Sequence, residues 1–299
     1  AHAEGVGTEA SSTQSHAEGR GTLASGTSAH AEGRDTVAGG NESHAEGFGT
    51  TANGAEAHAE GYFTTATGED AHSQGLFTVA SGDYSHAEGW TSTASGEDSH
   101  AEGFGSIASG SDSHAEGLTT SATTTASHSE GFNTASNGIA SHSEGFQTIA
   151  NNDASHAEGY STTAEGLASH AEGFETTSEG SFSHAGGSGS IASGATSFIH
   201  STNSLASGAR SAVLGGQNIT GATDDTVYVP FLNINNLATG TSVNNLGIDI
   251  DGNVVTGSTS GGGGGTGTTV FTTGSTGSFS VKAINSSTTD ATGDYAVAS

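Results

Sequence analysis

Small residues alternate with polar ones along this chain, in a unit that repeats every fourteen residues. In one unit, Ser85-His86-Ala87-Glu88-Gly89 forms a first alternating stretch, and residues 92–96 (Ser-Thr-Ala-Ser-Gly) form a second. Each stretch has the length of a short β-strand and ends at a glycine suited to a turn. Two strands per unit predict the coil of a flattened solenoid. A helix is disfavoured, because recurrent glycine, serine and threonine lower helix stability.

A histidine marks the register of the repeat. It stands at His2, His16, His30, His44, His58, His72, His86, His100, His114, His128, His142, His156, His170 and His184. Glycine follows three places after each of them, and glutamate fills the slot between, except for Gln74 and Gly186. Only His200 falls outside this register. So strict a period is structural, because an inserted residue would displace every later coil.

Alternation assigns the faces of the two strands. In the first strand, the Ser or Ala before the histidine and the Ala after it must point inward. In the second strand, the Thr or Ser and the Ala do the same, since two sheets this close leave no room for larger residues. His and Glu then point outward, on a face that hardly varies, whereas the outward residue of the second strand varies freely. We therefore predict that the His/Glu sheet faces copies of itself around an axis. The expected trimer interface comprises His2, Glu4, His16, Glu18, His30, Glu32, His44, Glu46, His58, Glu60, His86, Glu88, His100, Glu102, His114, Glu116, Phe198, Val213 and Leu214.

The repeat sets the predicted domain boundaries. Ser197 and Ser211 continue the register, so the β-roll is expected over 1–223, as a rod of roughly 70 Å at about 4.8 Å per coil. A small β insertion is expected over 224–256, with a hairpin at an Asp-Gly turn. A glycine-rich linker follows at 257–268. Residues 289–298 match residues 78–87 slot for slot, so 269–299 are expected to begin a second β-roll.

The frame Ser-His-Ala-Glu-Gly-x-x-Thr-x-Ala-x-Gly resembles the YadA-like (Hep/Hag) head repeats of trimeric autotransporter adhesins. The match covers residues 1–221 and restarts near 289. The resemblance implies an all-β fold, a left-handed parallel β-roll solenoid, three chains around an axis and a role in attachment. His and Glu stand where the family carries Val and Ile. In this respect the sequence departs from the dry apolar trimer core that the resemblance implies. The variant followed by Thr226-Val-Tyr-Val-Pro is also similar to phage tail-fibre proteins.

Composition narrows the possible partners. Only 31% of residues are hydrophobic and the formal net charge is -28, values that would suggest disorder without the repeat. Four basic residues against thirty-two acidic ones argue against nucleic acid and against anionic membranes. No apolar run approaches the roughly 20 residues of a membrane-spanning helix. The absence of cysteine excludes disulfides and thiolate sites.

The His-x-Glu pairs allow three interpretations. They could form hydrogen bonds between chains, hold a divalent metal on the trimer axis in layers such as His86 and Glu88, or face solvent. Pairing with carboxylates predicts a raised His pKa and a lowered Glu pKa. No catalytic residue is expected, because an active site is one constellation and this motif has no distinguished copy.

Two further columns follow the glycines. The residue after the first glycine is usually aromatic or apolar, and could serve as a glycan strip or seal a subunit seam: Phe48, Tyr62, Leu76, Trp90, Phe104, Leu118, Phe132, Phe146, Tyr160 and Phe174. We place it at the corner of the coil. Acids gather at the opposite corner, as a solvated ridge or a calcium ladder: Glu42, Glu56, Glu69, Asp70, Asp83, Glu97, Asp98 and Asp112.

The sequence thus predicts a structural fibre segment and not an enzyme. It would act as a homotrimer in attachment to a host receptor or glycan, as part of a phage-type tail fibre on a virion. The alternative is the head of a bacterial trimeric autotransporter adhesin at the cell surface.

Overall fold

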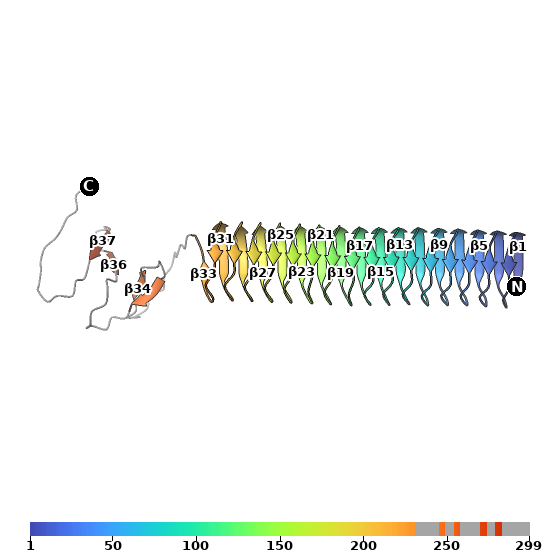
Figure 1. Cartoon of the computed structure of the whole chain (residues 1–299), viewed down its shortest axis with the longest axis horizontal. Coiled ribbons are helices and arrows are strands. Elements are labelled where there is room, and N and C mark those ends of the chain that lie inside the picture. Colours follow the sequence, from blue (N-terminus) through green and yellow to red (C-terminus); the bar gives the residue numbers. More distant parts are fainter. Residues whose placement is uncertain (231–244, 249–253, 258–269, 274–278, 283–299) are drawn as a thin grey trace, which may run out of the picture. The chain divides into compact units, whose positions relative to one another are not determined.

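The computed structural model describes residues 1–230, 245–248, 254–257, 270–273 and 279–282. The chain divides into two units, Ala1–Leu232 and Asn233–Ser299, and each is described by itself. The first unit is an all-β parallel solenoid, as predicted, in which every coil contributes one strand to each of two sheets (Figure 1).

The longer strands form a seventeen-stranded sheet and the shorter ones a sixteen-stranded sheet. The first sheet comprises β1 (His2–Val6), β3 (His16–Arg20), β5 (His30–Arg34), β7 (His44–Phe48), β9 (His58–Tyr62), β11 (His72–Leu76), β13 (His86–Trp90), β15 (His100–Phe104), β17 (His114–Leu118), β19 (His128–Phe132), β21 (His142–Phe146), β23 (His156–Tyr160), β25 (His170–Phe174), β27 (His184–Ser188), β29 (Phe198–Thr202), β31 (Ala212–Gln217) and β33 (Val227–Tyr228). The second comprises β2 (Glu9–Ala10), β4 (Leu23–Ala24), β6 (Val37–Ala38), β8 (Thr51–Ala52), β10 (Thr65–Ala66), β12 (Val79–Ala80), β14 (Thr93–Ala94), β16 (Ile107–Ala108), β18 (Ser121–Ala122), β20 (Ala135–Ser136), β22 (Ile149–Ala150), β24 (Thr163–Ala164), β26 (Thr177–Ser178), β28 (Ile191–Ala192), β30 (Leu205–Ala206) and β32 (Thr220–Gly221).

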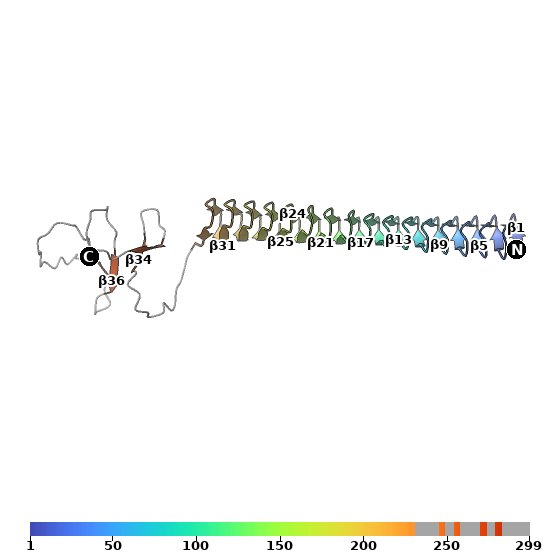
Figure 2. The same cartoon turned by 90° about the horizontal axis from the view of Figure 1, so that it is seen from below.

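The fourteen-residue period fixes the pairing of the strands. Each residue lies beside the residue of the same slot in the next coil, so that His86 pairs with His100 and Trp90 with Phe104. The two sheets remain on opposite sides of the rod along its length (Figure 2). The second strand spans two residues and not the predicted five, because a turn begins soon after its alanine.

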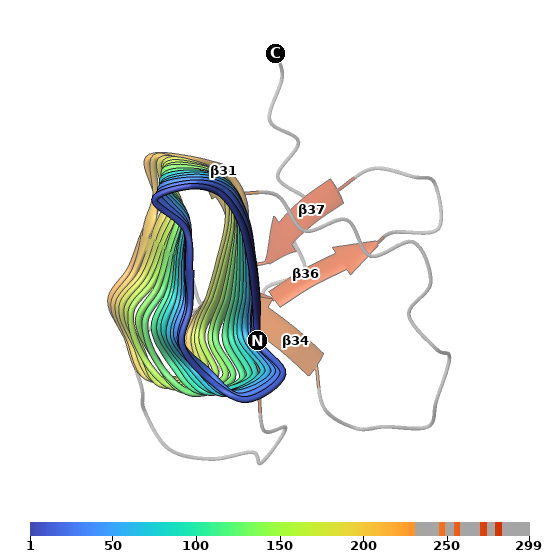
Figure 3. The ribbon, with the colours of Figure 1, turned by 90° about the vertical axis from the view of Figure 1, so that its right-hand side faces the viewer.

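Seen end-on, the coils lie one behind another and enclose a narrow interior between the two sheets (Figure 3). Small side chains fill this interior, as the alternation predicts. Ala87, Ala94 and Ser92 are all 0% exposed. Where a serine precedes the histidine it is also buried, and in several coils its hydroxyl donates to the carbonyl of the turn glycine three residues earlier, as Ser99 does to Gly96 at 2.7 Å. The same carbonyl accepts only a long backbone hydrogen bond, 3.4 Å from the N–H of Ser99, so the hydroxyl adds a shorter one inside the molecule.

The glycine next to the end of each longer strand is required by the close approach of neighbouring coils. Gly103 has φ +105°, and a Cβ there would lie 2.1 Å from the carbonyl oxygen of Gly117. The column loses its glycine at Ser201, and a register shift follows between His200 and Thr202 where β29 meets β31. Glycine in this slot thus permits the regular ladder.

Larger apolar residues fill the C-terminal end of the rod. Ile199 and Val213 are 0% exposed and pack with the half-buried Ile219 and Tyr228. The predicted outward position of Val213 is wrong, because Ala212 takes the histidine slot and Val213 the inward one after it. The parallel pairing also continues to β33, past the predicted boundary at residue 223.

The second unit contains two antiparallel strand pairs. β34 (Asn245–Ile248) pairs with β35 (Val254–Gly257), which agrees with the predicted hairpin, although its Asp-Gly turn lies outside the described residues. β36 (Val270–Thr273) pairs with β37 (Phe279–Lys282) in antiparallel fashion, unlike the strands of a β-roll. The residues that suggest a second roll, 289–298, and the glycine-rich linker at 258–268 also lie outside the described residues.

Candidate interaction face

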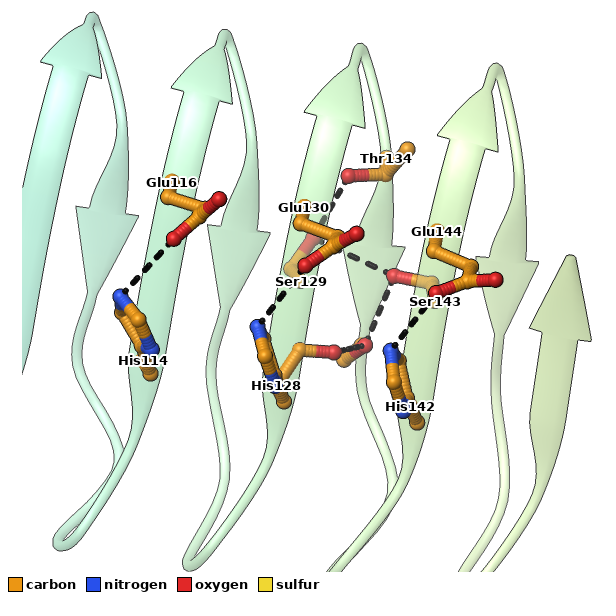
Figure 4. A network of polar contacts seen from close by, with 10 residues as sticks. His114, Glu116, His128, Ser129, Glu130, Thr134, His142, Ser143 and Glu144 are labelled. Carbon is orange, nitrogen blue, oxygen red and sulfur yellow. Dashed lines mark hydrogen bonds and ion pairs between the residues drawn. The ribbon is translucent and has the colours of Figure 1, made fainter.

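The outer face of the seventeen-stranded sheet, here called the His/Glu face, carries a continuous column of imidazoles. Neighbouring rings lie 4.7 to 5.0 Å apart, with planes only 1° apart for His86 and His100. This spacing follows from the strands, since in-register parallel pairing sets identical side chains one strand step apart. His114, His128 and His142 show the arrangement, with their glutamates on the same side and Ser129, Ser143 and Thr134 behind the strands (Figure 4).

Each glutamate lies close to an imidazole of its own chain. His100 Nε2 lies 3.7 Å from an Oε of Glu102 in the same coil, and His58 Nε2 lies 3.9 Å from Glu46 of the preceding coil. Among the described residues of this column, only His184 and Glu172, at 3.3 Å, form a hydrogen bond. The Nε2 atoms of the other imidazoles from His16 to His170 are buried without a hydrogen-bond partner. The imidazoles and carboxylates thus form a ladder of close polar contacts within one chain, with unused hydrogen-bonding capacity.

The pKa values of three histidines move opposite to the prediction. Burial, together with the neighbouring His72 and His100, lowers the pKa of His86 to about 4. Burial and adjacent imidazoles also lower the pKa values of His128 and His156. The glutamates act in the opposite direction and raise these pKa values. They do not outweigh burial, which disfavours the charged ring, because their oxygens lie beyond hydrogen-bond distance. The predicted rise is therefore wrong for these histidines.

Glu172 follows the prediction for carboxylates. Burial alone would raise its pKa, but the hydrogen bond from His184 and the nearby charges of His184 and His170 outweigh burial and lower the pKa. The difference from the histidines is geometric, since Glu172 is the carboxylate that reaches an imidazole.

A groove follows the glutamate column because the adjacent slot is glycine. Over the first six coils it has a volume of about 790 Å³, between Glu4 and Gly75. A second groove of about 700 Å³ runs from Glu130 to His200. Both grooves have carboxylates along one side and exposed backbone as their floor, so they suit cations and hydrogen-bond donors.

The aromatic column belongs to the same sheet. Trp90 and Phe104 are the last residues of β13 and β15, so the prediction that this column forms the corner of the coil is wrong. The bend towards the second sheet begins one residue later, at Thr91. Phe132 stacks on Phe146 at 4.8 Å, and Trp90 is 49% exposed. A stacked apolar strip thus runs beside the glutamate groove.

The predicted interface residues occupy this face with one exception. The His and Glu columns are half-buried by their own neighbours, except that His2 and Glu4 in the first coil are exposed. Phe198 and Leu214 are 38% and 42% exposed. Val213 is the exception, since it lies in the core.

The acidic corner has a structural use within the chain. Asp83 accepts a hydrogen bond from the backbone N–H of Glu69, one coil earlier, at 2.9 Å. Repulsion from Asp70 and Glu42, with some burial, raises the pKa of Glu56. The ridge therefore caps backbone donors while its charges repel one another, which agrees with a solvated ridge.

Comparison of the chain with protein-family models and with curated protein sequences finds no match. Within the described residues, no helix has the length and apolar character needed to cross a membrane.

Proposed function

We propose that this chain is a structural segment of a trimeric attachment fibre of the phage tail-fibre type. Its left-handed roll would place the His/Glu faces of three chains around a common axis. The rod would then act as a shaft that presents a host-binding element.

The contrast between the two outer faces carries this proposal. Histidine, glutamate and an exposed apolar residue recur along one sheet coil after coil, whereas the other sheet has Leu23, Thr65 and Ile107 in one slot. Solvent imposes no such uniformity, but packing against identical copies does. Exposed stacked aromatics and buried imidazole nitrogens without partners also suit a face that another chain covers.

The repetition also supports a structural role over catalysis. The coils from β3 to β25 present nearly the same side chains in the same geometry, so none is distinguished as a catalytic centre. Attachment fibres need length, stiffness and resistance to unfolding, which an in-register parallel solenoid supplies.

The test is the mass of the chain in solution, by light scattering at neutral pH with and without a chelator. We expect three times the 29.1 kDa of one chain. Phe104→Arg places a charge at the end of a strand of the seventeen-stranded sheet, and Ile107→Arg places one on the other sheet of the same coil. The two side chains are matched at 42% and 43% exposure.

Phe104→Arg should weaken the trimer and Ile107→Arg should leave it intact. A stable monomer for the unaltered chain, or equal effects of the two substitutions, would contradict the assignment of the face. A trimer lost with chelator would favour metal on the axis over His–Glu contacts.

A further inference from the structure

One layer of the His/Glu face departs from the repeat at two positions that lie side by side. Gly186 in β27 replaces the usual glutamate, and His200 occupies the glutamate slot of β29. The pairing of these two strands sets Gly186 directly against His200. Glu172 of β25 completes the group, so three successive coils meet at one point.

The three side chains converge on a small space. Glu172 Oε1 lies 3.3 Å from His184 Nε2 and 3.7 Å from His200 Nδ1, and all three ligand atoms lie within 4.8 Å of one another. A tetrahedral ion with ligands at about 2.0 to 2.1 Å holds its ligand atoms about 3.3 to 3.4 Å apart. The observed spacing therefore needs only a small inward movement to hold an ion.

Gly186 keeps this space open. A Cβ at this position would lie 2.7 Å from His200 Nδ1 and 3.0 Å from Glu172 Oε1. Gly186 is not among the glycines with positive φ, so its backbone does not require glycine. The absence of a side chain instead leaves room for Glu172 and His200 to approach each other.

The orientation of His184 is also exceptional. Its ring is turned 74° from that of His170, whereas the other successive imidazoles of the described column differ by 34° or less. The turned ring directs Nε2 at Glu172 within hydrogen-bond distance. The sequence departures, the open space and the turned ring thus coincide in one layer.

We propose that Glu172, His184 and His200 form a site for one divalent transition-metal ion of the zinc type. Two imidazoles and one carboxylate are a donor set that zinc accepts, with a fourth position left for water. An ordinary layer such as Glu88, His100 and Glu102 offers one imidazole and two carboxylates, a harder set with lower affinity for zinc.

The proposed ion would tie together three coils near the end of the regular repeat. It does not depend on the oligomeric state, because all three ligands belong to one chain. In a single chain, His200 is 60% exposed on its side chain and lines the second groove, so an ion can reach the site before three chains assemble.

The test is titration of the chelator-treated, untagged full chain with Co²⁺ at pH 7.5, followed by visible ligand-field absorption and competition with Zn²⁺. We expect one tightly bound equivalent of Co²⁺ per chain, which Zn²⁺ displaces. His200→Ala should remove it, and so should His200→Glu, which restores the residue usual in this slot and so preserves the fold. Gly186→Ala should weaken it at least tenfold, since changes in the surroundings that orient metal ligands typically cost 10- to 100-fold in affinity.

His100→Ala is the matched control, because it removes an imidazole from an ordinary layer and should leave the tight equivalent unchanged. The proposal is overturned if no tight equivalent appears, or if it survives both changes at His200. It is equally overturned if His100→Ala reduces it as much as His200→Ala does, since binding would then belong to the whole groove.

Discussion

Replacement of one glycine in the strand-end column should open the solenoid locally. In Gly103→Ala, the new Cβ would lie 2.1 Å from the carbonyl oxygen of Gly117, whereas ordinary contact begins near 3.4 Å. The two coils would have to separate by about 1.3 Å, enough to lengthen backbone hydrogen bonds beyond about 3.2 Å. Overpacking costs about 1 to 3 kcal/mol, and the left-handed φ of +105° adds about 1 to 2 kcal/mol. We therefore expect a loss of about 2 to 5 kcal/mol in the free energy of unfolding.

The same coil supplies a matched control. Gly105 also has positive φ, at +64°, but its Cβ would meet nothing closer than 3.7 Å. The same slot holds Thr91 and Thr119 at φ +55°, so side chains are tolerated there. Gly105→Ala should cost no more than about 1 kcal/mol, because reduced entropy of the unfolded chain offsets part of the strain.

The assay is urea unfolding at equal protein concentration, followed by far-UV circular dichroism, with hydrogen exchange to locate the weakened coils. Gly103→Ala should lower the midpoint and increase exchange in the coils on either side of it. Because a solenoid is stabilised by nearest-neighbour contacts, distant coils should keep their protection. Equal midpoints for the two alanine variants would refute the claim that steric contact between coils, and not φ alone, requires this glycine.

Three other predictions follow from the core and the imidazole column. Thr134→Val should cost about 1 to 3 kcal/mol because it removes the 2.8 Å hydrogen bond to buried Ser129 and leaves that hydroxyl only the 3.2 Å bond from Ser143. Thr50→Val should be neutral or stabilising, because the Thr50 hydroxyl has no partner; equal urea midpoints for the two variants would contradict this. Ile199→Ala should cost about 2 to 5 kcal/mol through a cavity at the C-terminal end, seen as early exchange of β29 and β31. The folded-state pKa of His86 lies below its unfolded value, so its contribution to stability is complete above pH 6.5 and falls as pH drops towards 4. The melting temperature should therefore decline over that window, and a flat profile would contradict the lowered pKa.

The imidazole column shows why the ladder geometry decides the electrostatics. Identical rings 4.7 to 5.0 Å apart cannot all become charged without mutual repulsion, and their own neighbours exclude part of the solvent. The glutamates lie at 3.5 to 4.0 Å from most rings and compensate only in part. Residue types and spacing in the sequence predicted the pairing, but the sign of the pKa shift depends on these distances.

The sequence by itself determined the solenoid, its fourteen-residue coil and the inward and outward slots, because in a parallel ladder the repeat is also the pairing register. Small residues at Ala87 and Ala94 and glycine at Gly103 are direct consequences of two close sheets. Only the tertiary structure decided where the strands end, and therefore that Trp90 belongs to the same strand as His86. It also decided that Glu172, His184 and His200 meet, since a contact across three coils depends on side-chain orientation and open space. The period of the sequence determines which residues pair between neighbouring coils, whereas the distances between side chains are set only when the coils stack.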